Sequence, residues 1–150
     1  MIIELSNKKI IEGATTVWYE HGPEVDIVMD LKKLSFKPGS VKKIYSFHVL
    51  DHFFEGEVLE AVNNWRDCLK DNGSLFCITD NFEYVSRMLI GGEVDMNTLN
   101  ANFSHPMHFS QDNLVEYMKK TGFVENKMVI WGAPDFMDRQ EFELVIEGKK

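Results

Sequence analysis

The sequence has 150 residues, of which 44% are hydrophobic, and it carries a formal net charge of −8 at pH 7. This length corresponds to a single domain, residues 1–150, and the apolar fraction excludes a disordered chain. Because an acidic chain without clustered Lys and Arg binds phosphate backbones poorly, we expect no nucleic-acid partner.

The two cysteines, Cys68 and Cys77, lie in apolar segments and do not form a Cys-x-x-Cys pair. We interpret both as small core residues of a protein in a reducing compartment. The first residues lack the basic region and apolar run of a signal peptide, and no apolar stretch approaches the ~20 residues that span a bilayer. We therefore expect a cytoplasmic protein with no membrane partner.

Four segments in the first half of the chain are rich in β-branched, aromatic and other apolar residues, which predicts β-strands. In chain order they are residues 2–5, 14–19, 25–31 and 41–50. Residues 57–69 then carry apolar side chains at helical spacing, which predicts a helix that is stopped by Asp71-Asn72-Gly73.

The second half of the chain alternates between predicted strands and helices. The segments are a strand at 74–79, a helix at 81–90 ended by Gly91-Gly92, a loop or lid at 93–109, a helix capped by Ser110 and ended by Thr121-Gly122, and strands at 123–131 and 141–146. We expect the last two strands to be antiparallel partners. This order favours an α/β fold with a mainly parallel sheet and an antiparallel edge.

Three segments resemble, in order and spacing, the second half of a class I S-adenosylmethionine (SAM)-dependent methyltransferase. IYSFHVLDHF, residues 44–53, is similar to the family's Ile-x-Ser-x-His-Val-Leu-Glu-His strand end. NWRDCLKDNGSLFCITD, residues 64–80, resembles the helix, Arg-x-Leu-Lys-Pro-Gly-Gly turn and strand that follow. FSQDNLVEYMKKTGFVE, residues 109–125, is similar to Phe-x-x-x-x-Leu-x-x-x-Leu-x-x-Ala-Gly-Phe. With residues 25–31 included, the resemblance covers most of the chain.

The resemblance implies a Rossmann-like, mostly parallel twisted sheet flanked by helices, with an antiparallel C-terminal edge strand. It also implies SAM as cofactor and methyl transfer to an oxygen or nitrogen of a small molecule or sugar. The partner would then be a small-molecule substrate, and a homodimer or a heteromeric partner stays open.

By resemblance, the cofactor site lies where the first four strands end. Its residues are Leu5, Ser6, Asn7, Trp18, Asp30, Leu31, Phe47 and His48. Asp30 fits the family position near the adenine. Trp18 and Tyr19 would fill the adenosine space or pack against a second copy.

Two positions depart from the family pattern. The family turn is Gly-x-Gly, because glycine permits close backbone approach to the cofactor, whereas this chain has Leu5-Ser6-Asn7. Trp18 replaces the family's ribose-binding acid, with Glu20 two residues further on. A left-handed Ser6 or Asn7 would preserve the turn, and a Leu5 that projects into the cleft would block it. A second hypothesis is therefore a catalytically degenerate member, a pseudoenzyme that acts as a binding module or subunit.

Histidines near the same sheet edge are the candidate general bases, because imidazole titrates near neutral pH. His48 and His52 follow the strand at 41–50, and ligands of such sheets bind beyond the carboxyl ends of the strands. By resemblance, His105 or His108 lines the substrate pocket. We assign catalysis to His48, His52 and His105. The structural alternative is that His48 caps or orients the following helix and that Asp51 is its first-turn acid.

A metal site formed by these histidines is the weaker hypothesis, because no Cys, Glu or Asp completes a recognised signature. We therefore assign no metal ligand. Asp80 is expected either in the site or as a helix N-cap. Phe136 and Met137, beside Pro134, would form an exposed apolar loop suited to a partner if they face solvent.

Overall fold

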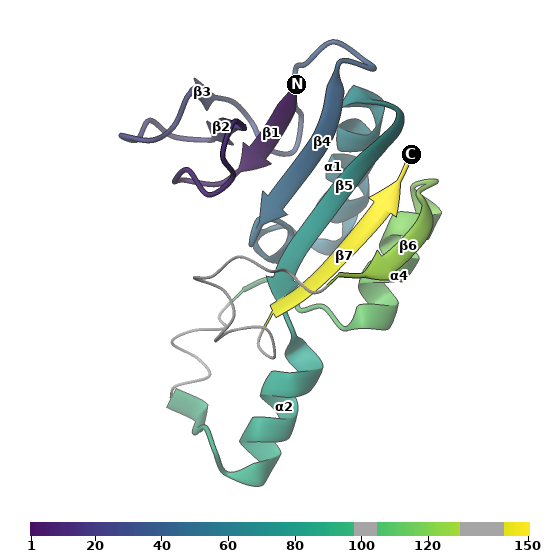
Figure 1. Ribbon diagram of the computed structural model, residues 1–150. Helices are drawn as coiled ribbons and strands as arrows, with labels where there is room; N and C mark the ends of the chain where they lie inside the picture. The colour runs from purple at the N-terminus through teal and green to yellow at the C-terminus, as the bar shows by residue number, and fades with distance from the viewer. Residues whose placement is uncertain (98–104, 130–142) are drawn as a thin grey trace.

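Seven strands form one sheet in the computed structural model, which describes residues 1–97, 105–129 and 143–150. The strands are β1 (Ile2–Leu5), β2 (Thr15–Trp18), β3 (Ile27–Val28), β4 (Val41–Phe47), β5 (Leu69–Asp80), β6 (Val124–Met128) and β7 (Glu143–Lys149). Their order across the sheet is β3-β2-β1-β4-β5-β7-β6 (Figure 1).

The strands from β1 to β5 pair in parallel, whereas β7 runs antiparallel to both β5 and β6. This confirms the predicted α/β fold with a mainly parallel sheet and an antiparallel C-terminal strand. The antiparallel pairing of the last two strands is also confirmed. Because β7 is inserted between β5 and β6, β6 occupies the edge of the sheet.

Helices α1 (Glu55–Cys68) and α4 (Gln111–Lys120) pack behind the sheet in Figure 1. Their apolar faces join the inner side chains of the strands in the main hydrophobic core. Trp65 is fully buried there, as its helical spacing predicts, and its Nε1 donates a hydrogen bond of 2.7 Å to the Leu31 carbonyl. This bond ties α1 to the segment that follows β3.

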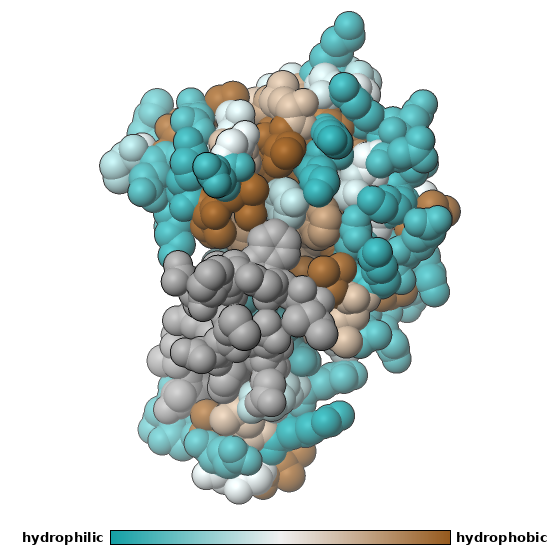
Figure 2. Space-filling model, in the orientation of Figure 1, coloured by the Kyte–Doolittle hydropathy of each residue, from teal (hydrophilic) through white to brown (hydrophobic). Residues whose placement is uncertain are grey.

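The opposite face of the sheet carries a second apolar cluster, made of Tyr45, Phe47, Phe76, Ile78 and Val145. Figure 2 shows apolar side chains gathered over β1 and β4 on this face. The connections at 6–14, 19–26 and 29–40 contain no helix. Within the described ranges, helices therefore cover one face of the sheet far more than the other.

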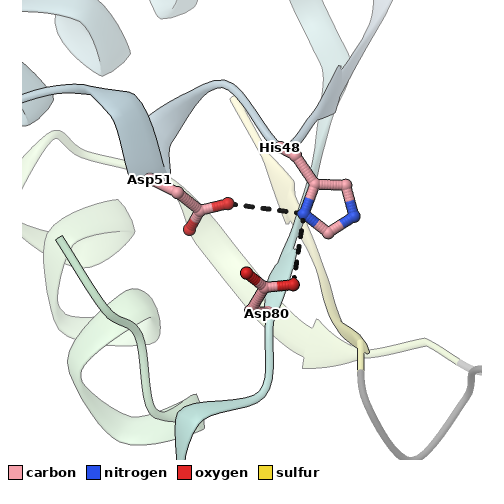
Figure 3. Close-up of side chains that lie close together, drawn as sticks. All are labelled: His48, Asp51 and Asp80. Atoms are coloured by element: carbon pink, nitrogen blue, oxygen red, sulfur yellow. Dashed lines mark ion pairs between the residues drawn. The ribbon is translucent and has the colours of Figure 1, made fainter. Parts of the chain in front are cut away.

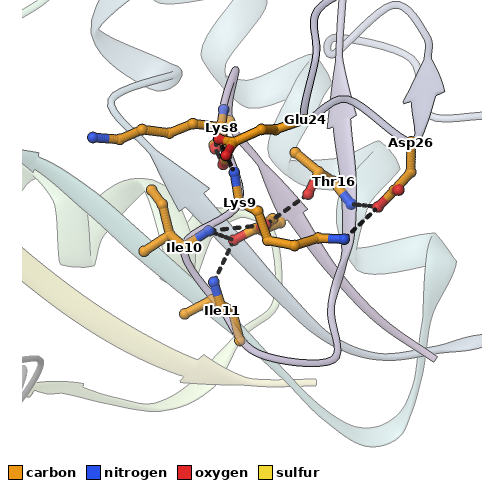
Figure 4. Close-up of polar contacts among 9 residues, drawn as sticks. Lys8, Lys9, Ile10, Ile11, Thr16, Glu24 and Asp26 are labelled. Atoms are coloured by element: carbon orange, nitrogen blue, oxygen red, sulfur yellow. Dashed lines mark hydrogen bonds and ion pairs between the residues drawn. The ribbon is translucent and has the colours of Figure 1, made fainter.

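The β1–β2 loop is held by a buried carboxylate. Glu4 is fully buried and accepts hydrogen bonds from the backbone N–H groups of Ile10 at 3.0 Å and Ile11 at 2.8 Å. The Thr16 hydroxyl donates a further bond of 2.7 Å to Glu4. Lys9 adds an ion pair to Asp26 at 3.3 Å (Figure 4). In this loop, side chains pair with the backbone N–H groups that a helix would pair in a longer crossover connection.

Several element ends differ from the sequence-based expectation. Helix α1 ends at Cys68 and β5 begins at once, so Asp71-Asn72-Gly73 lies in the strand and does not stop the helix. The β4–β5 register shifts there, and Asn72 takes a φ of 60°, a bulge-like arrangement that Asn tolerates. Strand β4 ends at Phe47 rather than at residue 50, because His48 adopts a φ of 49°.

The remaining helices follow the expected capping. Helix α2 (Phe82–Gly91) ends at Gly92, which has a φ of 75°, and Ser110 caps α4. The C-terminal end of the expected strand at 123–131, the segment between the last two expected strands and part of the predicted loop at 93–109 lie outside the described residues. No helix in the described part is long and apolar enough to cross a membrane.

Candidate active site

Two adjoining hollows open at the carboxyl ends of the parallel strands, and Trp18 and His52 line both of them. The first hollow has a volume of about 260 Å³ and is lined by Trp18, Tyr19, Asp30, Leu31, Lys32, Val49, His52 and Phe53. The second has a volume of about 300 Å³ and is lined by Ser6, Asn7, Lys8, Ile10, Trp18, Phe47, His48, His52 and Glu143. Sheets of this kind bind ligands at this edge.

The structure brings most of the expected cofactor residues to these hollows. Asp30 and Leu31 line the first, and the other four lining positions, Ser6, Asn7, Phe47 and His48, lie in the second, with Trp18 in both. Leu5 is the exception. It is fully buried in the main core, so it offers no surface to a ligand and does not block the cleft.

The turn after β1 is closed by a side chain. Among the described residues the non-glycine positions with positive φ are His48, Asn72 and Glu125, so neither Ser6 nor Asn7 adopts the left-handed conformation. The Ser6 hydroxyl instead accepts a bond of 3.1 Å from the Lys8 amide and donates one to the Lys8 carbonyl. Such serine turns replace glycine where no positive φ is needed.

His48 lies among three carboxylates that come from three different elements. Its Nδ1 is 3.4 Å from Asp51 in the short 3₁₀ helix η1 (Leu50–His52) and 3.5 Å from Asp80 at the end of β5 (Figure 3). Its Nε2 is 3.1 Å from Glu143 at the start of β7. Neither η1 nor α1 is capped by His48, so the helix-capping alternative is wrong, although Asp51 does lie in the first turn of η1.

These neighbours decide the charge of His48. Burial favours the neutral ring, but the close polar contacts with Asp51 and Glu143 and the charges of Asp51 and Asp80 outweigh it and raise the pKa to about 10. His48 is therefore an imidazolium at neutral pH. In this state it cannot accept a proton, so its geometry argues against a role as general base.

His52 has the opposite character. Burial, together with repulsion from His105, lowers the pKa of His52 against the attraction of Asp51. The rings of His52 and His105 meet edge to face with centroids 4.5 Å apart, and His105 Nδ1 lies 3.5 Å from Asp80. The three predicted histidines are thus brought together around Asp80, with His52 neutral at neutral pH.

The two aspartates of the cluster are unevenly buried. The Asp51 side chain is 1% exposed, and neither of its oxygens has a hydrogen-bond partner in the described part of the chain. Burial, with the charges of Asp51 and Glu143, raises the pKa of Asp80 to about 6 against the opposing charge of His48. Asn81, not Asp80, caps α2 by accepting from the Tyr84 amide, which leaves Asp80 to the site.

Glu143 is the member of the cluster that sequence reasoning missed. It lies opposite Asp80 in the β5–β7 ladder. An antiparallel strand brings its first residues, not its last, to the carboxyl edge of its parallel neighbours. The available signal was that Glu143 is an acid in the first half of the last expected strand.

The other expected residues lie elsewhere. His108 stacks on the ring of Phe82 with centroids 4.8 Å apart and lines neither hollow. Phe136 and Met137, expected to form an exposed partner loop, are outside the described residues.

The family profile described as "Methyltransferase domain" matches residues 6–77. No curated protein matches the chain significantly. Among solved structures, one match is a SAM-dependent methyltransferase from Thermotoga maritima, described as a possible histamine N-methyltransferase. It is 19% identical with a TM-score of 0.62, and the alignment covers 84% of this chain and 64% of the Thermotoga chain.

Two further structures share the fold. Human N-acetylserotonin methyltransferase in complex with SAM is 11% identical with a TM-score of 0.61, over 92% of this chain and 41% of its own. A chain in a Haloferax volcanii complex between the Trm112 methyltransferase activator and the putative methyltransferase is 13% identical with a TM-score of 0.57. The alignment covers 90% of this chain and 71% of the Haloferax chain. The chain thus spans less than two thirds of the Thermotoga and human proteins.

The chain thus has the fold of class I, Rossmann-like SAM-dependent methyltransferases, and just under half of it, residues 6–77, matches the methyltransferase profile. The shared fold does not by itself assign the activity of these longer proteins to this chain, because fold does not determine function.

Proposed function

We propose that this chain binds SAM across the two joined hollows and transfers its methyl group to an oxygen or nitrogen of a small molecule or sugar. The observation that supports this most is the shared lining of the hollows by Trp18 and His52. It makes one elongated site at the edge of the sheet where the family's cofactor residues were expected. Volumes of this order suit a small organic ligand.

The first hollow suits the adenosine part. Trp18 and Tyr19, whose ring centroids are 4.9 Å apart, provide apolar walls together with Phe53. Asp30, at the position expected near the adenine, is a carboxylate in its lining that can accept hydrogen bonds from ligand hydroxyl or amino groups. The second hollow, with Ser6, Asn7 and Phe47, would then receive the methionine part.

SAM supplies an already electrophilic methyl group, so the protein has to orient the acceptor and take its proton. His52 lines both hollows and therefore lies where the two parts of the ligand would join. We assign it as the general base. His48, which is fixed between Asp51, Asp80 and Glu143, contributes a polar side chain to the wall of the second hollow.

The experiment is a calorimetric titration of the purified chain with SAM, and with S-adenosylhomocysteine as a second ligand. We expect saturable, one-to-one binding that is lost in Trp18→Ala and weakened in Asp30→Asn. Glu116→Gln is the matched control, because that side chain is exposed on α4 and pairs with Lys120. Absence of binding up to millimolar concentrations of both ligands would overturn the proposal.

A second candidate is a catalytically degenerate subunit, a pseudoenzyme. It is favoured by the β1 turn without glycine, by the missing ribose acid, and by the connection at 6–14 without a helix. The Haloferax structure shows a methyltransferase-like chain bound to an activator, which suits a heteromeric partner. Light scattering separates a homodimer from a monomer, and a dimer or a required partner together with absent SAM binding would favour this candidate.

We further propose that the protein is cytoplasmic and that residues 1–150 form a single domain. Cys68 and Cys77 are both free and buried, which fits a reducing compartment.

A further inference from the structure

One histidine and two aspartates converge at the carboxyl edge of the sheet, close enough together to share a metal ion. Nδ1 of His48 lies 3.4 Å from an Asp51 oxygen and 3.5 Å from an Asp80 oxygen, and the three candidate ligand atoms all lie within 4.8 Å of one another. A tetrahedral ion with bonds of about 2.1 Å separates its ligand atoms by about 3.4 Å. In Figure 3 both carboxylates point toward the same ring nitrogen of His48.

Asp51 provides an independent observation. It is 1% exposed, and neither of its oxygens has a hydrogen-bond partner within the described ranges. A buried carboxylate without hydrogen bonds is costly unless a cation compensates it. Among the described residues, the ion pair of Asp51 is with the ring of His48, which also faces Asp80 and Glu143.

Glu143 fixes the ring in the orientation that a metal ligand requires. It lies 3.1 Å from Nε2 and can accept that N–H, which leaves Nδ1 directed at the two aspartates. A histidine that binds metal commonly donates its other N–H to a carboxylate, which fixes the tautomer and makes the ring a better ligand. Two carboxylates facing an unprotonated Nδ1 would repel its lone pair, so a proton or a cation must lie between them.

We propose that His48, Asp51 and Asp80 bind a divalent transition-metal cation at the carboxyl edge of the sheet, with Glu143 as the residue that positions the histidine. One imidazole and two carboxylates form a mixed nitrogen and oxygen set, which suits Mn²⁺ or Zn²⁺ better than the all-oxygen sites of Ca²⁺. Three protein ligands leave positions open for water or an acceptor oxygen. His105, 3.5 Å from Asp80, lies at the rim.

This site differs from the histidine cluster considered at the sequence level. Its ligands come from the end of β4, from η1 and from the end of β5, and only one of them is a histidine. The parallel pairing of β4 and β5, not the spacing along the chain, brings them together. The proposal is independent of SAM binding, because the ligands and the test involve no cofactor.

The test is a titration of the chelator-treated protein with Mn²⁺. Binding is measured as the loss of the free Mn²⁺ signal in electron paramagnetic resonance. We expect one Mn²⁺ per chain, displaced by Zn²⁺ but not by Ca²⁺. Binding should be lost in Asp80→Asn and in Asp51→Asn, and weakened about 10–100-fold in Glu143→Gln, which acts through His48. His21→Gln is the matched control, because His21 is exposed on the β2–β3 connection.

A second measurement needs no variant and so does not depend on whether the variants fold. Bound Mn²⁺ should broaden the ring signals of His48 in the NMR spectrum well before those of His21. Absence of Mn²⁺ and Zn²⁺ binding, or binding that survives both aspartate changes, would overturn the proposal. Either result leaves the calorimetric test with SAM intact, so the two failures can be told apart.

Discussion

Asp80 and Glu143 lie directly opposite each other in the antiparallel ladder of β5 and β7, and the ring of His48 pairs with both. Two acids facing each other across a ladder repel, so this pair is stable only with a cation beside it. Without a metal, the imidazolium of His48 serves that purpose. Ion pairs with His48 therefore stabilise this edge of the site, and the free energy of unfolding should depend on whether the His48 ring is protonated.

The first prediction concerns pH in the metal-free protein, kept in a chelator. The pKa of His48 rises from 6.5 to about 10 on folding, so its stabilisation is complete below pH 6.5 and is lost as the pH rises toward 10. Urea unfolding should show the wild-type free energy of unfolding falling across this window by more than that of His48→Gln. Parallel pH profiles of the two proteins would contradict the assigned charge of His48.

The fold was largely predictable because its signals are local. Apolar runs mark β1, β2, β4 and β5, and helical spacing places Trp65 in the core of α1. The positions of Ser110 and Gly92 as caps follow from their local chemistry. Strand β3 is shorter than its apolar run, because only Ile27 and Val28 find a ladder partner in β2.

The site was predictable only in part, because it depends on contacts between distant segments. The strand ends predicted that His48, His52 and Asp30 lie at the carboxyl edge of the sheet, and all three line the hollows there. That His48 is charged could not be foreseen, since Glu143 is 95 residues away in sequence. The closure of the β1 turn by Ser6 and Glu4 was likewise hidden, because a buried acid in a strand gives no signal of the amides that it will accept.

The second prediction tests Glu4 as the support of the second hollow. In Glu4→Gln the amide would place an N–H group against the donors of Ile10 or Ile11, which leaves buried N–H groups unpaired. We expect a loss of about 1–3 kcal/mol in unfolding free energy and weaker SAM binding, because this loop lines the hollow. Glu12→Gln, an exposed change in the same loop, is the control and should alter neither quantity.

The third prediction compares two glycines. A Cβ at Gly148 in β7 would lie 2.5 Å from Met118 Cε and 2.6 Å from Asn126 Oδ1, so Gly148→Ala overpacks the contact between β7 and α4. We expect a destabilisation of about 1–3 kcal/mol. Gly56→Ala in α1 meets no atom within 4 Å and should stabilise the helix by up to about 1 kcal/mol. Equal unfolding midpoints for the two variants would show that the packing of β7 against α4 is looser than described.

The last prediction separates the roles of His52 and His48 in catalysis. For any acceptor that the wild type methylates, His52→Gln should lower kcat by about 10²–10⁴-fold, because the general base is lost. His48→Gln should change the affinity for ligands more than the proton transfer, since its ring is already protonated at neutral pH.

The measurement is the rate of S-adenosylhomocysteine formation as a function of pH, with calorimetric SAM affinity determined for each variant. The wild-type rate should rise with pH through a value below 6.5, where the lowered pKa of His52 lies. This rise should vanish in His52→Gln and persist in His48→Gln and in the exposed control His21→Gln. A rise that persists without His52 would assign the base to another group, with His105, in ring contact with His52, as the nearest candidate.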